Sequence, residues 1–106
     1  MIGKYKVVAL CGSTKFKNEF IDMLRRLTLE GYVVLLSGVY AHSRDSITDK
    51  SKLMLDDMHK RKIYMSDEIY VINKNDYIGD STNSEIEYAK AQGKPVNYMC
   101  PHNLNR

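Results

Sequence analysis

Long apolar runs are missing from this chain of 106 residues. No stretch approaches the roughly 20 consecutive apolar residues that a bilayer-spanning helix needs, so we expect no membrane association. Residues 1–6 show no signal-peptide pattern and lead directly into a strand-like segment. These two absences predict a cytoplasmic protein.

Cysteine is scarce and the charge is weak. The two cysteines, Cys11 and Cys100, are far apart and form no Cys-x-x-Cys pair, so nothing indicates a disulfide framework or a zinc site. The three histidines, His42, His59 and His102, have no metal-ligand spacing with one another or with the carboxylates. We therefore expect no metal and no cofactor, and a surface or packing role for each histidine. A dispersed net charge of +3 gives no reason to expect nucleic-acid binding.

The length suits one domain, residues 1–106, built around one hydrophobic core. Apolar runs typical of buried strands alternate with segments of helical periodicity. The predicted strands are Lys6–Leu10, Tyr32–Leu36, Glu68–Asn73 and Pro95–Met99. The predicted helices are one that starts with Ser13 or Thr14 as N-cap and stops at Glu30-Gly31, one at about Lys50–Met65, and one at about Asn83–Gln92.

The inner faces of the first two helices are predicted from their apolar periodicity. In the first helix the predicted inner residues are Phe16, Phe20, Leu24 and Leu27, and in the second they are Leu53, Leu55, Met58 and Ile63. Between the second strand and the second helix, residues 37–51 form a long polar connection, of a length that is usually functional or mobile. The tail, residues 100–106, has no pattern and is expected to fray.

This order of elements predicts an α/β fold: a small three-layer, Rossmann-like or flavodoxin-like domain with a four-stranded parallel sheet. The expected strand order is 2-1-3-4. In that order, the loops after the first and third strands leave the carboxyl edge of the sheet side by side. Residues 11–14 and 73–85 would then share one crevice, with Asn73 at its start.

The sharpest functional candidate is Glu85, at the end of the hydroxyl-rich segment Gly79–Glu85. A turn of this kind before a helix exposes backbone N–H groups that suit an anion or a ribose. A carboxylate there can attack an anomeric carbon in glycosyl transfer. The competing interpretation is a capping box, in which Glu85 bonds back to the Thr82 amide and has only a structural role.

Other residues are candidates by position alone. The turn Cys11-Gly12-Ser13-Thr14 either binds phosphate through its backbone or simply joins a strand to a helix, with Cys11 as a small buried residue. The possible partner acids around the third strand are Asp67, Asp76 and Asp80, each of which could also be an ordinary turn or strand-end residue. Tyr77 and Tyr88 are candidates for stacking on a base.

Two loops together resemble those of a known family. Val8-Ala-Leu-Cys-Gly-Ser-Thr14, Ser84-Glu-Ile-Glu-Tyr-Ala89 and Gly93-Lys-Pro-Val96 are similar to segments of the nucleoside 2-deoxyribosyltransferase-like proteins. Related families are the nucleoside 5'-monophosphate N-glycosidases and the cytokinin-activating phosphoribohydrolases. The chain departs from their pattern at Glu87, where those families have glycine, and it has no Gly-Gly or Gly-Thr phosphate turn before Glu85.

The resemblance implies roles for residues of both loops. Glu85 would be the nucleophile or a ribose-binding carboxylate, with Asp67 or Asp80 as helper acid. The implied pocket residues are Gly12, Ser13 and Thr14 for sugar or phosphate, and Ser81 and Thr82, next to Asn83, for a 5'-phosphate.

The expected function is therefore hydrolysis or transfer at the N-glycosidic bond of a nucleoside or nucleotide. The alternatives are a nucleotide sensor without turnover and a protein-interaction domain. A four-stranded sheet with three helices is expected to leave an apolar face for a homodimer.

Overall fold

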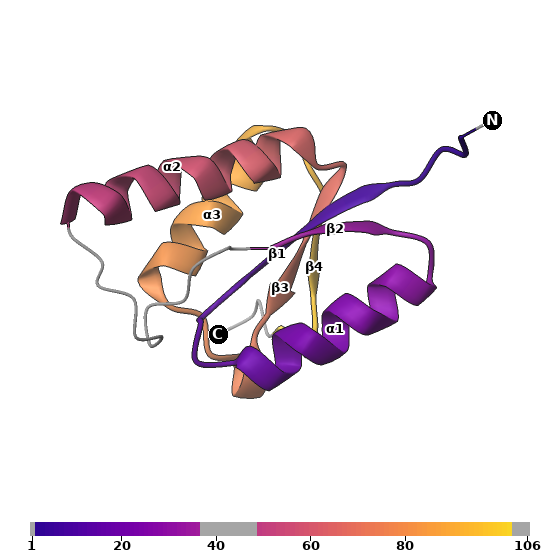
Figure 1. Ribbon diagram of the computed structural model, residues 1–106. Coiled ribbons are helices and arrows are strands. Elements are labelled where there is room, and N and C mark those ends of the chain that lie inside the picture. Colours follow the sequence, from indigo (N-terminus) through magenta and orange to yellow (C-terminus); the bar gives the residue numbers. More distant parts are fainter. Residues whose placement is uncertain (1, 37–48, 103–106) are drawn as a thin grey trace.

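The computed structural model describes residues 2–36 and 49–102. Four parallel strands form one sheet in the order β2-β1-β3-β4, with α1 on one face and α2 and α3 on the other (Figure 1). Along the chain the elements are β1 (Val7–Gly12), α1 (Lys17–Leu29), β2 (Val33–Leu35), α2 (Asp49–Met65), β3 (Glu68–Ile72), the short 3-10 helix η1 (Lys74–Asp76), α3 (Asp80–Ala91) and β4 (Val96–Tyr98). The predicted three-layer α/β fold and its 2-1-3-4 strand order are confirmed. Most of the predicted long connection and the last four residues of the tail lie outside the described residues.

Strand β1 lies at the centre of the sheet and is covered on both faces. Val8 and Leu10 belong to the apolar cluster under α1, whereas Ala9 and Cys11 belong to the cluster under α2 and α3. All four side chains are almost completely buried. A strand with two covered faces is apolar throughout instead of alternating, which is why this run was recognisable in the sequence. The alternation along β1 also directs Cys11 toward α2 and α3.

The start of α1 differs from the prediction. The helix begins at Lys17 with Phe16 as N-cap and no capping side chain, so neither Ser13 nor Thr14 caps it. Ser13 instead closes the turn before the helix: its carbonyl accepts a hydrogen bond from the Phe16 amide at 3.0 Å, and its Oγ accepts one from the Lys15 amide at 3.3 Å. The Ser13 hydroxyl therefore stabilises the turn before α1 and does not cap the helix.

The inner face of α2 also differs from the prediction. The buried side chains are His59 and Ile63, and Leu55 is half-buried one turn earlier. Leu53 and Met58, predicted to face the core, are 72% and 46% exposed. Met58 lies five positions before Ile63, which is about 140° around a helix, so the two cannot both face the sheet. Burial of Ile63 fixes the helix phase and turns His59 inward.

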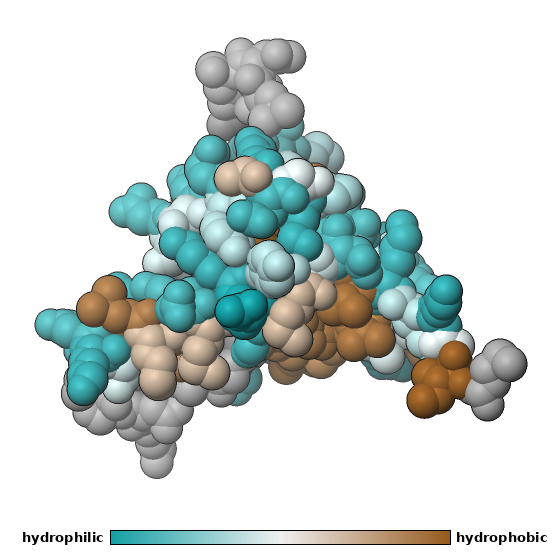
Figure 2. All heavy atoms as spheres, turned by 90° about the horizontal axis from the view of Figure 1, so that it is seen from above, coloured by the Kyte–Doolittle hydropathy of each residue, from teal (hydrophilic) through white to brown (hydrophobic). Residues whose placement is uncertain are grey.

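Several apolar side chains remain exposed on the outer side of α2. They are Leu53, Met54, Met58 and Met65. Viewed from the side of the molecule on which α2 lies, apolar residues in tan and brown lie among hydrophilic ones (Figure 2). The homodimer expected from such surface stays a prediction. Among the described residues, no helix combines the length and apolar content that a membrane span requires.

We expect Gly12→Ala to destabilise the protein, because β1 ends in close contact with β3. A Cβ on Gly12 would lie 2.8 Å from the Ile72 carbonyl oxygen and 3.0 Å from the Ile72 Cβ, so backbone must move. Overpacking of this kind costs about 1–3 kcal/mol, measurable by guanidinium denaturation. Gly79→Ala is the matched control: its new Cβ meets nothing closer than 3.5 Å, and we expect a change below about 1 kcal/mol. Equal losses for the two variants would contradict the close-contact explanation.

Candidate functional site

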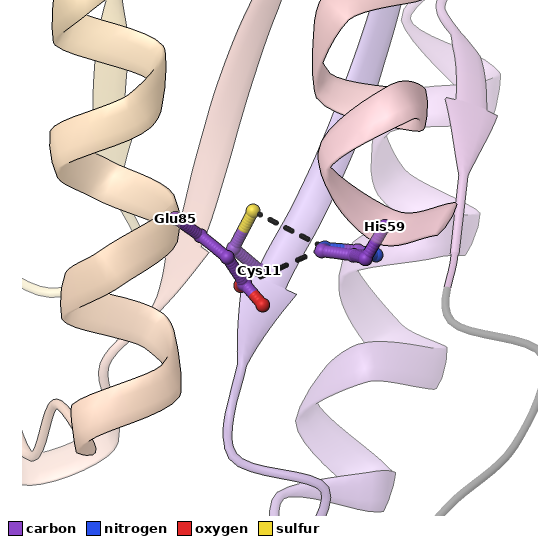
Figure 3. A group of neighbouring side chains, drawn as sticks. All are labelled: Cys11, His59 and Glu85. Atoms are coloured by element: carbon purple, nitrogen blue, oxygen red, sulfur yellow. Dashed lines mark hydrogen bonds and ion pairs between the residues drawn. The ribbon is translucent and has the colours of Figure 1, made fainter. Parts of the chain in front are cut away.

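Three side chains from three elements converge under α2 and α3. Cys11 comes from β1, His59 from α2 and Glu85 from α3, and they point toward one another (Figure 3). The Cys11 Sγ lies 3.5 Å from His59 Nε2, and a Glu85 carboxylate oxygen lies 3.6 Å from the same nitrogen. One ligand-type atom from each residue falls within 4.8 Å of the other two. The three residues are referred to below as the Cys–His–Glu cluster.

The fold holds this cluster in its interior. Cys11 is buried, and the side chains of His59 and Glu85 are 9% and 14% exposed. Glu85 immediately precedes Ile86, a core residue, and Ile63 holds the helical turn that follows His59. Regular elements packed on the sheet therefore fix all three side chains. The remaining exposure of Glu85 connects the cluster to solvent.

Burial dominates the acid–base properties of the cluster. Desolvation raises the pKa of Glu85 from its ordinary 4.5 to about 7, although a hydrogen bond from Cys11 acts in the opposite direction. Desolvation and the neighbouring Lys62 charge lower the pKa of His59 to about 4. Burial, together with the Glu85 charge, raises the pKa of the Cys11 thiol well above its usual range. At neutral pH, His59 is uncharged and Cys11 is a thiol, so the His59–Glu85 contact is not an ion pair.

The capping-box interpretation of Glu85 is wrong. Helix α3 begins at Asp80 with Gly79 as its N-cap, and the Asn83 amide donates to the Gly79 carbonyl at 2.9 Å. Glu85 is thus in the second turn of the helix, beyond the free N–H groups that a capping carboxylate satisfies. Thr82 is an internal, buried helix residue instead of a cap. No capping role accounts for the burial of the Glu85 carboxyl.

The cluster does not have the geometry of a catalytic relay. In a nucleophile–histidine–acid triad, the nucleophile and the acid contact different nitrogens of the imidazole. Here both Cys11 and Glu85 approach Nε2, and His59 Nδ1 is buried without a hydrogen-bond partner among the described residues. Cys11 is also a buried thiol with a raised pKa, the opposite of an activated cysteine. Three donor atoms that converge on one point are better suited to holding something between them.

The structure does not bring the predicted partner acids Asp67 and Asp80 to Glu85. Asp67 Oδ2 accepts a hydrogen bond from the Val7 amide at 2.7 Å, at the start of β1. Cys11 lies four residues further along that strand, about 13 Å away. Asp80 is exposed and lies five positions before Glu85, about 140° around α3. Asp67 is therefore at the amino edge of the sheet, and Asp80 is on another face of the helix.

Asn73, predicted to bind substrate, has its amide fully engaged in the fold. Its side-chain nitrogen donates to Asp76 Oδ1 and to the Cys100 carbonyl, both at 3.1 Å, and its oxygen accepts from the Cys100 amide at 2.8 Å. Asp76 Oδ1 also contacts His102 Nδ1 at 2.6 Å. Asn73 is completely buried and ties the end of β3 to the segment after β4. These hydrogen bonds give Asn73 a structural role.

The other predicted pocket residues differ in exposure. Gly12 pairs with Ile72 at that edge, which confirms that the first and third loops leave it side by side. Ser81 and Asn83 are exposed on α3, whereas Tyr88 is half-buried and packs against the core under that helix. Ser13 and Thr14 are half-buried in the turn after β1.

A basic hollow lies beside the start of α1. Its volume is about 410 Å³, and its lining consists of Lys15, Phe16, Lys17, Asn18, Glu19, Lys74 and Asn75. The Lys15 ammonium lies 3.6 Å from the centre of the Tyr77 ring, and Lys74 forms a 3.4 Å ion pair with Glu19. Two of the three lysines thus already have a partner, and the hollow retains an excess of positive charge.

Comparisons with known proteins support the fold. Neither a protein-family model nor a curated protein matches this chain. Among solved structures, the chain is similar to a conserved protein from Enterococcus faecalis V583, with a TM-score of 0.63 and 17% sequence identity. The similarity covers 90% of this chain and 63% of that protein, so this chain spans less than two thirds of its length. At this level of identity the similarity shows a shared fold.

The raised pKa of Glu85 predicts a pH-dependent difference in stability between the wild type and Glu85→Gln. Folded Glu85 keeps its proton up to about pH 7, whereas the unfolded side chain loses it near 4.5, so stability falls as pH rises between these values. Relative to Glu85→Gln, the wild type should lose about 3 kcal/mol of unfolding free energy between pH 4 and pH 8. The charged or titratable groups around Glu85 are Cys11 on β1 and Asp56, His59 and Lys60 on α2. Denaturant titrations at several pH values, with EDTA present, measure this difference.

Glu87→Gln serves as the control for this measurement. Glu87 lies on the same helix but is exposed, so its substitution should leave the pH dependence of the unfolding free energy as in the wild type. The lowered pKa of His59 contributes the opposite slope between about pH 4 and 6.5, and it is present in all three proteins. A constant difference between wild type and Glu85→Gln across the pH range would refute the assigned environment of Glu85.

Proposed function

We propose that this chain hydrolyses or transfers the N-glycosidic bond of a nucleoside or nucleoside 5'-monophosphate, with Glu85 as the nucleophile. The observation that carries this proposal is the Glu85 carboxyl, held nearly buried at the carboxyl end of β1 without a capping role. A buried carboxyl with a strongly shifted pKa is costly for stability and is typical of functional sites. The motif around Glu85 resembles that of nucleoside 2-deoxyribosyltransferase-like proteins, and this resemblance is the reason for proposing glycosidic chemistry.

The proposed reaction has two steps. A carboxylate oxygen of Glu85 forms a bond to C1' of the sugar while the C1'–N bond breaks, and the base leaves with the bonding electron pair and takes a proton from water. Water or a second base then attacks C1', releases the sugar from Glu85 and restores the carboxylate. With a pKa of about 7, Glu85 is largely ionised at pH 8, as the nucleophile requires.

A second candidate function is nucleotide binding without turnover. The observation that favours it is the basic hollow beside α1, where Lys15, Lys17 and Lys74 could attract a phosphate group. The shared carboxyl edge of β1 and β3 is where ligands bind in open parallel sheets. A sensor would use the hollow and leave the glycosidic bond intact.

The test is release of free base. Purified protein is incubated at pH 8 with a panel of ribo- and deoxynucleosides and their 5'-monophosphates, and chromatography follows the base. We expect release by the wild type with at least one substrate, and a rate at least about 10²-fold lower for Glu85→Gln, because the amide cannot act as the nucleophile. Glu87→Gln, exposed on the same helix, should retain the wild-type rate.

The same panel distinguishes the two candidate functions. If no substrate releases base but a nucleotide raises the melting temperature, the proposed catalytic function is wrong and nucleotide sensing takes its place. Substitution of Lys15 and Lys17 by Ala should then remove that increase, whereas Glu85→Gln should keep it. Base release that persists in a folded Glu85→Gln variant would rule out Glu85 as the nucleophile.

A further inference from the structure

We propose that the Cys–His–Glu cluster binds a thiophilic divalent transition-metal ion, for which Zn²⁺ is the best fit. The donor atoms are Cys11 Sγ, His59 Nε2 and one carboxylate oxygen of Glu85, all within 4.8 Å of one another. They come from β1, α2 and α3, so the site exists only in the folded chain. The separations of 48 residues between Cys11 and His59 and of 26 between His59 and Glu85 explain why no ligand motif is visible in the sequence.

Two of the three distances between donor atoms match those of a tetrahedral zinc site. Typical bond lengths of about 2.3 Å to sulfur and about 2.1 Å to nitrogen and oxygen place a sulfur and a nitrogen ligand about 3.6 Å apart, and a nitrogen and an oxygen about 3.4 Å apart. The corresponding separations here are 3.5 Å for Cys11 Sγ to His59 Nε2 and 3.6 Å for His59 Nε2 to Glu85. The third separation, between Cys11 Sγ and the Glu85 oxygen, is at most 4.8 Å.

Convergence on one point separates this cluster from a hydrogen-bonded chain. Both the thiol and the carboxyl approach the same nitrogen, Nε2, which has one lone pair or one hydrogen and cannot serve both partners well. A shared cation satisfies all three donors at once. An imidazole nitrogen is a common ligand of such cations.

The donor types and charges select the metal. A thiolate and an imidazole favour zinc-like ions over Mg²⁺ or Ca²⁺, which prefer oxygen ligands. On binding, the Cys11 thiol and any protonated Glu85 lose their protons to solvent as the metal–sulfur and metal–oxygen bonds form. One thiolate and one carboxylate then balance the two positive charges of the ion inside a low-dielectric region.

Three protein ligands leave a fourth tetrahedral position. Sites of this composition hold water or a substrate there, whereas structural zinc sites have four protein ligands. Glu85 is the most exposed of the three side chains and keeps the cluster in contact with solvent. This inference does not rest on the proposed glycosidic reaction, since metal binding is measured without any nucleoside.

Cobalt absorption spectroscopy tests the proposal directly. Reduced, chelator-treated protein is titrated with Co²⁺, which reports a coordinated thiolate by a sulfur-to-metal charge-transfer band. We expect a band that saturates at one equivalent, disappears on addition of Zn²⁺, and is unaffected by Mg²⁺. Cys11→Ser should remove the band, and His59→Gln and Glu85→Gln should weaken Co²⁺ binding at least about tenfold.

Cys100→Ser provides the matched control, since Cys100 is the other free cysteine and lies outside the cluster. It should retain the band and its stoichiometry. The proposal is overturned by the absence of a thiolate band in the wild type, by a band that survives Cys11→Ser, or by a band lost in Cys100→Ser. Circular dichroism monitors folding, and if Cys11→Ser does not fold, wild-type affinity in folded His59→Gln overturns the proposal.

Discussion

The parallel pairing of β1 with β3 is the contact on which the rest of the structure depends. Five residue pairs join the two strands, from Val8 with Glu68 to Gly12 with Ile72. Parallel neighbours cannot be joined by a tight turn, so helices must cross between them and cover the sheet. The register also decides the site: a slip of one residue would turn Cys11 toward α1, away from His59 and Glu85. Strand pairing thus sets the chemistry of the carboxyl edge.

The Cys–His–Glu cluster makes the core less stable than an apolar cluster of the same volume would. A thiol, an imidazole and a carboxyl occupy positions that aliphatic side chains could fill with better packing and no loss of hydration. The raised pKa of Glu85 and the lowered pKa of His59 both record that lost hydration. The surrounding residues, Ala9, Ile63, Val71 and Ile86, form an ordinary apolar core. A polar cluster set into such a core is better explained by binding or catalysis than by stability.

The central strand β1 was predictable because burial on both faces leaves a continuous apolar run in the sequence. Val7–Leu10 is such a run, and the observed strand order is the one that we expected for alternating strands and helices. The starts of α1 and α3 were not predictable from their hydroxyl residues, since Ser13 closes a turn and Thr82 is buried inside a helix. Cap residues are ambiguous because the same side chains also stabilise turns.

The candidate site was only partly visible for a different reason. Glu85 was recognisable from its place after the third strand, but the inward position of His59 depends on the phase of α2. That helix is apolar on more than one side, so its sequence allows several phases, and only contact with the sheet through Ile63 chooses one. A phase anchored on Ile63 alone would have placed His59 one turn away on the buried face. Tertiary contact, and not local pattern, assembled the site.

The two outer strands are the shortest elements of the sheet. β2 and β4 have three residues each, while β1 has six. Short edges present few unpaired backbone groups, so they give little template for a strand from a second molecule. The edges of this sheet therefore disfavour pairing with a strand from another molecule. Association between copies of this chain would therefore use side chains on the helices, such as the exposed apolar side chains of α2.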